Sequence, residues 1–304
     1  MIANPASKAW LILAALLAFA AMSPCVADEL QWRQAFAAAQ QAYRQGDLPA
    51  AERQARSAVR EAEGLAGDGL RLSATLDFQS VVLLEQQRYA EAEAATRRAL
   101  ALREEASGPD HPRVAFQCTN LGLAAAGQAR YGEAESLHRR ALDILERAGG
   151  AQDIGRALVM NNLAELQRTT GRHAEAEPLY RAALVVIEKA LGTEHRYTAI
   201  LQNNLALLLA AGARHQEAER LYRLSLATRE RTLGATHPAV ATTLVNYAAL
   251  LEARARYPDA ERQLRRALSI REAAYGGEHP LLSGPLLGLA RIEAVRLQDA
   301  AAQA

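Results

Sequence analysis

Between Tyr89 and Tyr257 the sequence repeats itself every 42 residues without insertion or deletion. Each repeat carries an arginine, then a tyrosine or histidine, and three residues later an Ala-Glu pair. The arginines are Arg88, Arg130, Arg172, Arg214 and Arg256, and the glutamates are Glu93, Glu135, Glu177, Glu219 and Glu261. A fixed period of this length indicates a solenoid, because each unit buries its apolar face only by stacking on its neighbours.

Residues 1–27 have the layout of a secretory signal peptide. Lys8 precedes an apolar run at residues 9–22, and Cys25-Val26-Ala27 supplies small residues before a cleavage site that we expect after Ala27. The run would span about 21 Å as a helix, short of the ~30 Å hydrocarbon core, which disfavours a retained anchor. Pro24 before Cys25 disfavours lipidation. We therefore expect a periplasmic or secreted protein.

The mature chain is expected to be formally neutral. Removing Lys8 from 35 basic residues leaves 34, which equals the number of acidic residues. This balance argues against nucleic acid or anionic membrane as the main partner. Cys118 would be the only cysteine left, so no intrachain disulfide is expected. No other apolar run approaches membrane-spanning length, and the richness in alanine and arginine over lysine is typical of GC-rich bacterial genomes.

One repeat, residues 172–213, illustrates the expected local structure. Apolar residues recur at steps of three and four from Ala176 to Ile187, which predicts an amphipathic helix ended by Gly192. A second helix is expected over residues 197–211. Small residues recur where the two helices must approach closely. They are Gly122, Ala164, Ala206, Ala248 and Ala290 in one helix, and Ala92, Ala134, Ala176, Ala218 and Ala260 in the other.

The polar face also repeats. Each glutamate of an Ala-Glu pair stands four residues before an arginine: Arg97, Arg139, Arg181, Arg223 and Arg265. This orientation stabilises a helix by roughly 0.3–0.5 kcal/mol per pair. We interpret the series as a solvated helix face.

The repeat resembles the tetratricopeptide repeat, in the 42-residue variant of kinesin light chains and many bacterial proteins. The resemblance rests on Asn161-Asn-Leu-Ala-Glu-Leu, on Gly171-Arg-His-Ala-Glu-Ala-Glu-Pro-Leu-Tyr-Arg-Ala-Ala-Leu, and on Gly234-Ala-Thr-His-Pro. It implies an all-α fold, a right-handed α-solenoid of about six antiparallel helix pairs with a C-terminal capping helix.

We place the repeats at residues 30–71, 72–111, 112–153, 154–196, 197–237 and 238–279, with the capping helix at 280–304. The first helices are expected to begin near Leu30, Leu72, Pro112, Ile154, Tyr197 and Pro238. The capping helix is expected to bury Leu286, Leu289, Ala290 and Ile292, and to expose Arg291, Arg296, Gln298 and Asp299.

Asparagines form a further column at the same period. It consists of Asn120, Asn162, Asn204 and Asn246, doubled by Asn161 and Asn203. Asparagine is a mediocre helix former, so this recurrence needs a reason. The resemblance implies that the first helix of each pair lines a concave face, where asparagines bind an extended peptide. In the structural alternative, each amide tethers a neighbouring helix or loop, and both roles can coexist. In the first two repeats the column reads Ala37 and Phe78, so the polar groove is expected only in repeats three to six.

The positions that flank this column are mostly apolar. They are Phe116, Leu123, Leu158, Glu165, Arg168, Ile200, Leu207, Thr242 and Glu252. Such a strip suits a peptide with an apolar anchor. Because Arg168 is its only basic residue, recognition of an acidic or phosphorylated tail is disfavoured.

The remaining candidates for chemistry favour structural roles. His111, His195, His237 and His279 recur in the linkers, too far apart to share one metal ion, and we expect them to close the turn before the next helix. Cys118 is expected to be a buried, inert thiol. We find no catalytic constellation and expect neither an enzyme nor a bound cofactor or metal.

The sequence therefore favours an exported scaffold that binds a protein or peptide in its concave groove, as an adaptor or assembly factor of the bacterial cell envelope. The alternative is a structural envelope protein that associates with itself. Neither the partner's identity nor the oligomeric state follows from the sequence.

Overall fold

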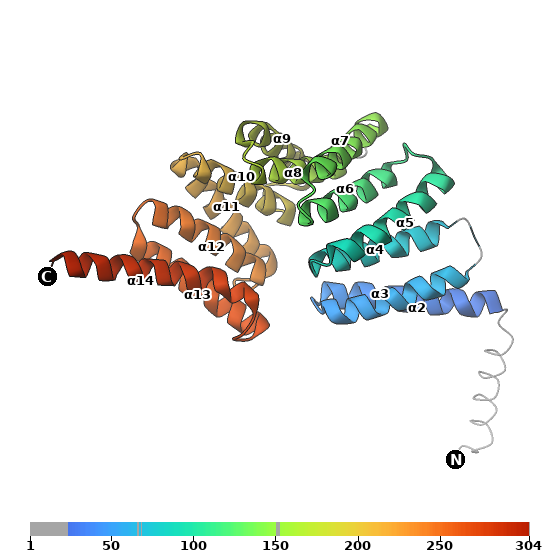
Figure 1. Ribbon diagram of the computed structural model, residues 1–304, viewed down its shortest axis with the longest axis horizontal. Coiled ribbons are helices and arrows are strands. Elements are labelled where there is room, and N and C mark those ends of the chain that lie inside the picture. The colour runs from blue at the N-terminus through green and yellow to red at the C-terminus, as the bar shows by residue number, and fades with distance from the viewer. Residues whose placement is uncertain (1–23, 66, 68, 150–152, 304) are drawn as a thin grey trace, which may run out of the picture. The chain divides into compact units, whose positions relative to one another are not determined.

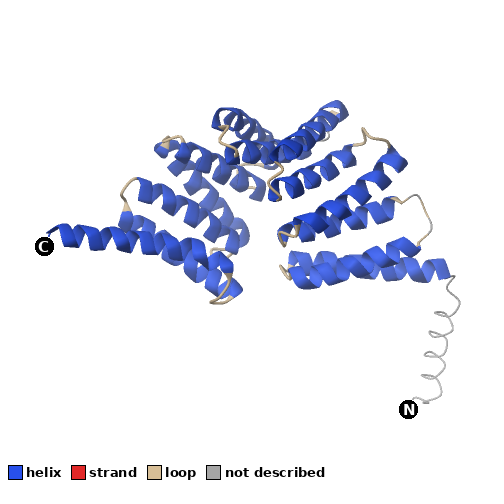
Figure 2. Ribbon diagram, viewed as in Figure 1, coloured by secondary structure: helices blue, strands red, loops and turns tan. Residues whose placement is uncertain are grey.

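The computed structural model describes residues 24–65, 67, 69–149 and 153–303. Most of the expected signal peptide, residues 1–23, lies outside this part of the chain. Helices and short turns make up the described residues, which contain no strand (Figure 2). The chain forms two units, residues 1–148 and 149–304, which we describe separately.

The first unit consists of three helix pairs (Figure 1). Their bounds are α2 (Pro24–Arg44), α3 (Leu48–Gly64), α4 (Leu70–Glu85), α5 (Tyr89–Ser107), α6 (Pro112–Gly127) and α7 (Tyr131–Ala148). Helices α2 and α3, α4 and α5, and α6 and α7 pack as pairs. The pairs stack through contacts between α3 and α4 and between α5 and α6, and α4 also meets α6.

The second unit continues the same arrangement. Its bounds are α8 (Asp153–Thr169), α9 (His173–Leu191), α10 (Arg196–Ala211), α11 (His215–Leu233), α12 (Pro238–Ala253), α13 (Tyr257–Tyr275), a 3-10 turn η2 (Pro280–Leu282) and α14 (Ser283–Gln303). The first helices of successive pairs touch, α8 with α10 and α10 with α12. We call the face that they line the inner face of this unit. The all-α repeat architecture expected from the sequence is confirmed.

Histidine closes the linkers by capping the next helix. The Nδ1 atoms of His111, His195, His237 and His279 each accept a hydrogen bond from the backbone N–H two residues later, over 3.1–3.2 Å. Each bond satisfies one of the N–H groups that a helix start leaves without an intrahelical partner. The expected role of this column in the turn is confirmed.

Small residues occupy the crossing points between paired helices. Ala164, Ala206 and Ala248 of the first helices, and Ala176 and Ala218 of the second, are fully buried. Their small side chains leave room for large ones, and Tyr180 and Tyr222 lie fully buried in the same core cluster. In α6 the position is Gly122, where an added Cβ would lie 2.6 Å from Cε1 of His138. The glycine thus accommodates the buried imidazole.

Helix α14 departs from the expected capping arrangement. Ile292 is buried and Leu289 packs against the core, but Leu286 and Ala290 are exposed, so their expected burial was wrong. Gly288 takes the place of a small crossing residue, because a Cβ there would lie 2.7 Å from Cδ1 of Leu264. The 3-10 turn η2 directly precedes α14. Of the residues expected outside, Arg291, Arg296 and Gln298 are exposed, while the side chain of Asp299 lies outside the described part.

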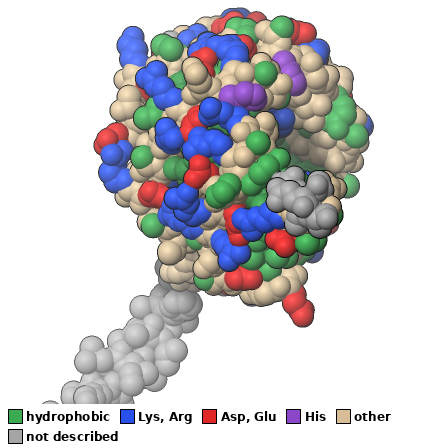
Figure 3. Space-filling model, turned by 90° about the vertical axis from the view of Figure 1, so that its left-hand side faces the viewer, with side chains coloured by type: hydrophobic (Ala, Val, Ile, Leu, Met, Phe, Trp, Pro, Cys, Tyr) green, Lys and Arg blue, Asp and Glu red, His purple; other side chains and the backbone are tan. Residues whose placement is uncertain are grey.

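The glutamates of the Ala-Glu pairs form the expected ion pairs with the arginines four residues later. Their surroundings differ from a solvated face. The five side chains are only 11–29 % exposed, and Glu93, Glu177 and Glu219 also bind Arg130, Arg214 and Arg256 of the next repeat. Basic and acidic side chains accordingly lie beside one another on the face seen in Figure 3. The interpretation as a solvated face holds for the five arginines, whose side chains are 42–72 % exposed, but not for the carboxylates, which are largely covered.

The pKa of Glu93 reflects this double contact. Burial by itself would raise the pKa, but hydrogen bonds from Gln128, Arg97 and Arg130 and the charge of Arg130 lower it to about 2. The carboxylate therefore stays ionised at physiological pH. Its ionic links between repeats persist until the solution becomes strongly acidic.

The first unit also holds a buried polar cluster between α4 and α6. Gln117 donates from Nε2 to Oγ of Ser73 over 3.0 Å and to Oδ2 of Asp77 over 3.2 Å. Oδ1 of Asp77 is buried without a hydrogen bond. Burial raises the pKa of Asp77 to about 6, although the Gln117 bond and the charges of Arg103 and Arg113 oppose the rise. The ionised form is thus disfavoured in the folded chain.

We predict that Asp77→Asn stabilises the protein at neutral pH. Because the pKa of Asp77 is higher in the folded than in the unfolded chain, its penalty is complete above about pH 6 and absent below about pH 4. The gain in unfolding free energy at pH 7.5 is expected to be on the order of 2 kcal/mol. Urea unfolding at pH 7.5 and at pH 4 measures it, and the gain should vanish at the lower pH. Asp143→Asn, an exposed position on α7, is the control. Loss of stability at pH 7.5 in Asp77→Asn would contradict the prediction.

Candidate functional site

The inner face of the second unit carries five asparagines in the middle of its first helices. Asn161 and Asn162 lie on α8, Asn203 and Asn204 on α10, and Asn246 on α12. The 42-residue register places them at the same height, because each helix pair adds one equivalent helix to this face. Asn203 is buried, with 4 % of its surface exposed, and the other four are half-buried.

The five side chains are joined by hydrogen bonds into one ladder. Asn246 donates to Asn203 over 3.2 Å, and Asn203 donates to Asn204 over 3.1 Å. Asn204 then donates to Asn161 over 3.0 Å, and Asn161 donates to Asn162 over 3.3 Å. Two of these bonds cross between helices of neighbouring repeats. They are the contacts that the structural interpretation of the column expects.

The ladder leaves hydrogen-bonding capacity on the inner face. An amide nitrogen carries two hydrogens and its oxygen has two lone pairs, so each asparagine can make bonds beyond those of the ladder. Among the described residues, Nδ2 of Asn162 donates to no acceptor and Oδ1 of Asn246 accepts from no donor. The ladder therefore ends with a donor on α8 and an acceptor on α12. Its tethering role is compatible with binding, which stays a prediction.

Asn120 belongs to the first unit. It lies on α6, and its Nδ2 is 3.4 Å from Oγ of Ser80 on α4. The place of the column on α4 is taken by Phe78, which packs edge-on against Phe36 and Tyr43. The structure thus brings five of the six predicted asparagines together and places Asn120 beside Ser80 in the first unit.

Apolar side chains flank the asparagines. On α10, Ile200 is exposed and Leu207 is half-buried, and on α8, Leu158 is half-buried. Phe116 and Leu123 are exposed on α6 of the first unit. Thr242 is exposed on α12. Exposed apolar side chains beside amides fit the expected preference for a polypeptide with an apolar anchor.

The charged positions of the strip are already paired. Arg168 donates to Glu165 through Nε and Nη2 over 2.9 and 2.5 Å, and the hydroxyl of the buried Tyr180 donates to the same carboxylate over 2.7 Å. Glu252 accepts two bonds from Arg291 of α14. Burial raises the pKa of Tyr180, so it remains a donor. The strip thus offers no surplus positive charge to an acidic tail.

The other candidates lie outside this site. Cys118 is fully buried, and burial raises the pKa of its thiol, as the interpretation of an inert cysteine expects. The described residues contain no group of three or more His, Cys, Asp or Glu side chains that could hold a metal ion. No helix in the described part of the chain is long and apolar enough to cross a membrane.

The bonds that join neighbouring repeats could not be predicted from the sequence pattern. The ladder bonds that cross between helices link residues 43 apart, a separation created by the doubled asparagines. The ionic contacts between repeats follow the same logic, because they join a glutamate to the arginine 37 residues later, as in Glu93–Arg130 and Glu177–Arg214. Both separations, 43 and 37 residues, recur in the sequence. Only the packing of the helices shows that residues at these separations are in contact.

A family model for the tetratricopeptide repeat matches residues 71–147, 116–184, 153–231, 197–273 and 239–304. The chain belongs to the tetratricopeptide repeat family. No curated protein sequence matches it.

Solved structures similar to this tetratricopeptide repeat chain share its fold at low sequence identity. BtubC (BKLC) from P. vanneervenii is 22 % identical, with 84 % of this chain and 94 % of that chain covered and a TM-score of 0.57. A putative kinesin light chain with nearly identical TPR-like repeats from Podospora anserina is 20 % identical, with 70 % and 100 % covered and a TM-score of 0.56. A Rap protein in complex with competence and sporulation factor is 13 % identical, with 89 % and 76 % covered and a TM-score of 0.61. The likeness to kinesin light chain repeats is confirmed at the level of fold.

Proposed function

We propose that this protein binds an extended polypeptide segment along the inner face of its second unit. The observation that carries the proposal is the asparagine ladder, whose spare hydrogens and terminal oxygen lie beside Leu158, Ile200 and Leu207. An extended peptide presents N–H and C=O groups at intervals of about 3.3 Å and needs a partner for each group that it buries. Amides meet this need whatever the peptide's side chains, while the apolar residues select an anchor.

The same proposal assigns a non-enzymatic role as adaptor or assembly factor in the bacterial cell envelope. The Rap protein that shares the fold was solved in complex with competence and sporulation factor. This complex supports the proposal that the fold of this chain serves to bind a partner. Residues 1–27, with their signal-like layout, support export. The neutral mature chain favours a protein partner over nucleic acid or lipid.

We predict that Asn162→Ala weakens peptide binding while leaving stability nearly unchanged. Asn162 ends the ladder and accepts a single bond, so its removal should lower the unfolding free energy by less than about 1 kcal/mol. Binding is measured as retention of the purified protein on an immobilised library of extended peptides. The melting temperature is recorded in parallel.

Asn203→Ala is the matched control. Asn203 is buried and takes part in two ladder bonds, so its truncation leaves Asn246 without an acceptor and should destabilise by roughly 1–3 kcal/mol. Unchanged retention of Asn162→Ala on the same peptides would refute a binding role for the column. A large drop in its melting temperature would instead assign Asn162 to the scaffold.

We predict that the mature protein begins at Asp28. Sequencing the N-terminus of protein recovered from the periplasm or medium of an expressing bacterium tests this. Changing Ala27 to a bulky residue should leave the precursor uncut, because signal peptidase sites require small residues. Recovery of a chain that still begins at Met1 in the cytoplasm would contradict export.

A second candidate function, self-association, is favoured by α14. Leu287, Ala290, Ala294 and Leu297 follow one another at steps of three and four and are all exposed, Leu287 by 61 % and Leu297 by 63 %. One face of this helix thus repeats the apolar spacing that buries the other helices of the stack. A second copy offers an identical stripe for an isologous contact.

Sedimentation velocity distinguishes the two candidates. If α14 mediates self-association, the protein sediments as a dimer at micromolar concentration, and replacing Leu287 and Leu297 with serine yields a monomer. A monomer at all concentrations without these changes would exclude stable self-association. Serine at the exposed Leu224 of α11 serves as control.

A further inference from the structure

Helices α10, α11 and α12 of the second unit contact one another (Figure 1), and a buried arginine of α11 lies at their junction. Arg229 is only 7 % exposed, and its Nη1 donates to the backbone carbonyl oxygen of Ala239 in the first turn of α12. The equivalent positions of the two preceding repeats carry Leu145 and Ile187, which are both buried. A charged side chain thus takes the place of a core residue at this junction.

Arg229 has no acidic partner in the part of the chain that the structure describes. Burial lowers the pKa of its guanidinium to about 10. Three repeats earlier, burial raises the pKa of Asp77 and the charge of the equivalent arginine, Arg103, opposes that rise. In the second unit Asn203 stands at the position of Asp77, which removes the negative charge. A buried cation without an opposite charge is costly.

One edge of the Arg229 guanidinium remains available for a ligand. Its Nε and Nη2 atoms have no hydrogen-bond acceptor among the described residues. Other arginines of this chain bind a carboxylate with the same two atoms, as Arg97 does with Glu93 and Arg168 does with Glu165. This edge directs two parallel N–H groups toward one negatively charged acceptor.

The hydroxyl of Thr243 provides a further donor. Thr243 is fully buried on α12, and its Oγ1 has no hydrogen-bond partner within the described residues. A threonine inside a helix can donate to the carbonyl four residues back, as Thr119 does to Ala115. For Thr243 that carbonyl belongs to Ala239, which already accepts from Arg229. The hydroxyl and the guanidinium therefore lie close to one carbonyl group, and the hydroxyl hydrogen is free for another acceptor.

The start of α12 adds to the positive potential at this place. The first turn of a helix carries a partial positive charge on its N–H groups. The guanidinium of Arg229 lies at this end of α12, where a cation is disfavoured. An anion is attracted both by the guanidinium and by the start of the helix.

We propose that the junction of α10, α11 and α12 binds a small monovalent anion, such as chloride, between Arg229 and Thr243. The anion accepts hydrogen bonds from the Nε–Nη2 edge and from the Thr243 hydroxyl. It balances the single positive charge that Asn203 leaves without a carboxylate. The anion is small because Arg229, Thr243 and Asn203 are only 7, 0 and 4 % exposed, which excludes a bulky ligand. This site does not require that the asparagine ladder bind a peptide.

The test compares the melting temperature of the full chain in sodium chloride and in sodium gluconate at equal ionic strength. Gluconate is monovalent as well, but it is too bulky to reach Arg229. An anion that binds only the folded chain stabilises it by an amount that grows with the logarithm of the anion concentration above its Kd. We expect the melting temperature to rise by a few degrees when chloride replaces gluconate.

Two variants remove the expected contacts. Arg229→Leu should abolish the difference between the two salts, and it should fold because Leu145 occupies the equivalent position. Thr243→Val keeps the shape of the side chain and loses the hydroxyl. It should weaken chloride binding about tenfold, as derived from the dependence of the melting temperature on chloride concentration.

Arg271→Leu is the matched control. Arg271 is buried to a similar extent, and its Nη1 donates to the carbonyl oxygen of Leu281. The position equivalent to Thr243 is Pro285, which has no hydroxyl. This variant should therefore keep the full difference between chloride and gluconate.

The proposal is overturned if the unchanged protein melts at the same temperature in both salts, or if Arg229→Leu keeps the difference. An equal loss in Arg271→Leu would also overturn it, because the effect would then not belong to this junction. An unchanged chloride affinity in Thr243→Val would refute the contact with the hydroxyl. Crystals grown in sodium bromide should show an anomalous peak within hydrogen-bond distance of Arg229, whereas peaks at exposed arginines alone would mean an adventitious ion only.

Discussion

Each helix pair of this chain has more apolar surface than it can cover by itself, and the rest of the structure depends on covering that surface with the next pair. Alanines at the crossing points bring the helices close, and large side chains such as Tyr180 and Tyr222 fill the space between repeats. The hydrophobic effect drives this stacking, because the area removed from water grows with every repeat added. Polar groups caught between repeats must then find partners there.

The polar contacts follow from this constraint. Where two pairs meet, Glu93, Glu177 and Glu219 are largely covered, and each is compensated by arginines of its own repeat and of the next. A covered carboxylate without such partners would be costly, whereas a paired and hydrogen-bonded one is tolerated. The ion pairs thus compensate the burial of the carboxylates, which allows the repeats to stack in this register. On the inner face, the asparagine ladder likewise gives the partly buried amides hydrogen-bond partners.

Much of the fold and part of the candidate site could be predicted from the sequence. The 42-residue period located the helices, the small crossing residues, the capping histidines and the asparagine column, because these depend on position within one repeat. The burial of the glutamates, the links from Asn204 to Asn161 and from Asn246 to Asn203, and the exposure of Ala290 could not be predicted. They depend on how one pair is rotated against the next, and on the turn before α14.

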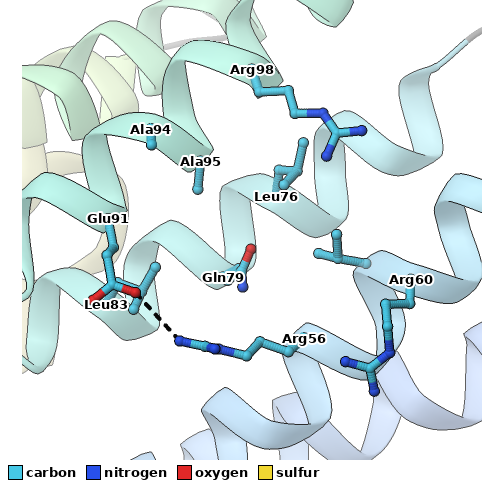
Figure 4. A pocket seen from close by; sticks show the side chains of 10 residues that line it. Arg56, Arg60, Leu76, Gln79, Leu83, Glu91, Ala94, Ala95 and Arg98 are labelled. Carbon is cyan, nitrogen blue, oxygen red and sulfur yellow. Dashed lines mark hydrogen bonds and ion pairs between the residues drawn. The ribbon is translucent and has the colours of Figure 1, made fainter.

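The structural consequences of departures from the repeat become visible only in the folded chain. Ala95 and Gln79 are ordinary residues in a helical sequence, and only the fold makes them part of the lining of an open groove between α3, α4 and α5 (Figure 4). The sequence by itself determined the period, the helix pairs and the family, because local spacing of apolar residues and turn residues sets them. The tertiary structure alone decided which polar groups satisfy each other and which remain available, because that depends on distances between repeats.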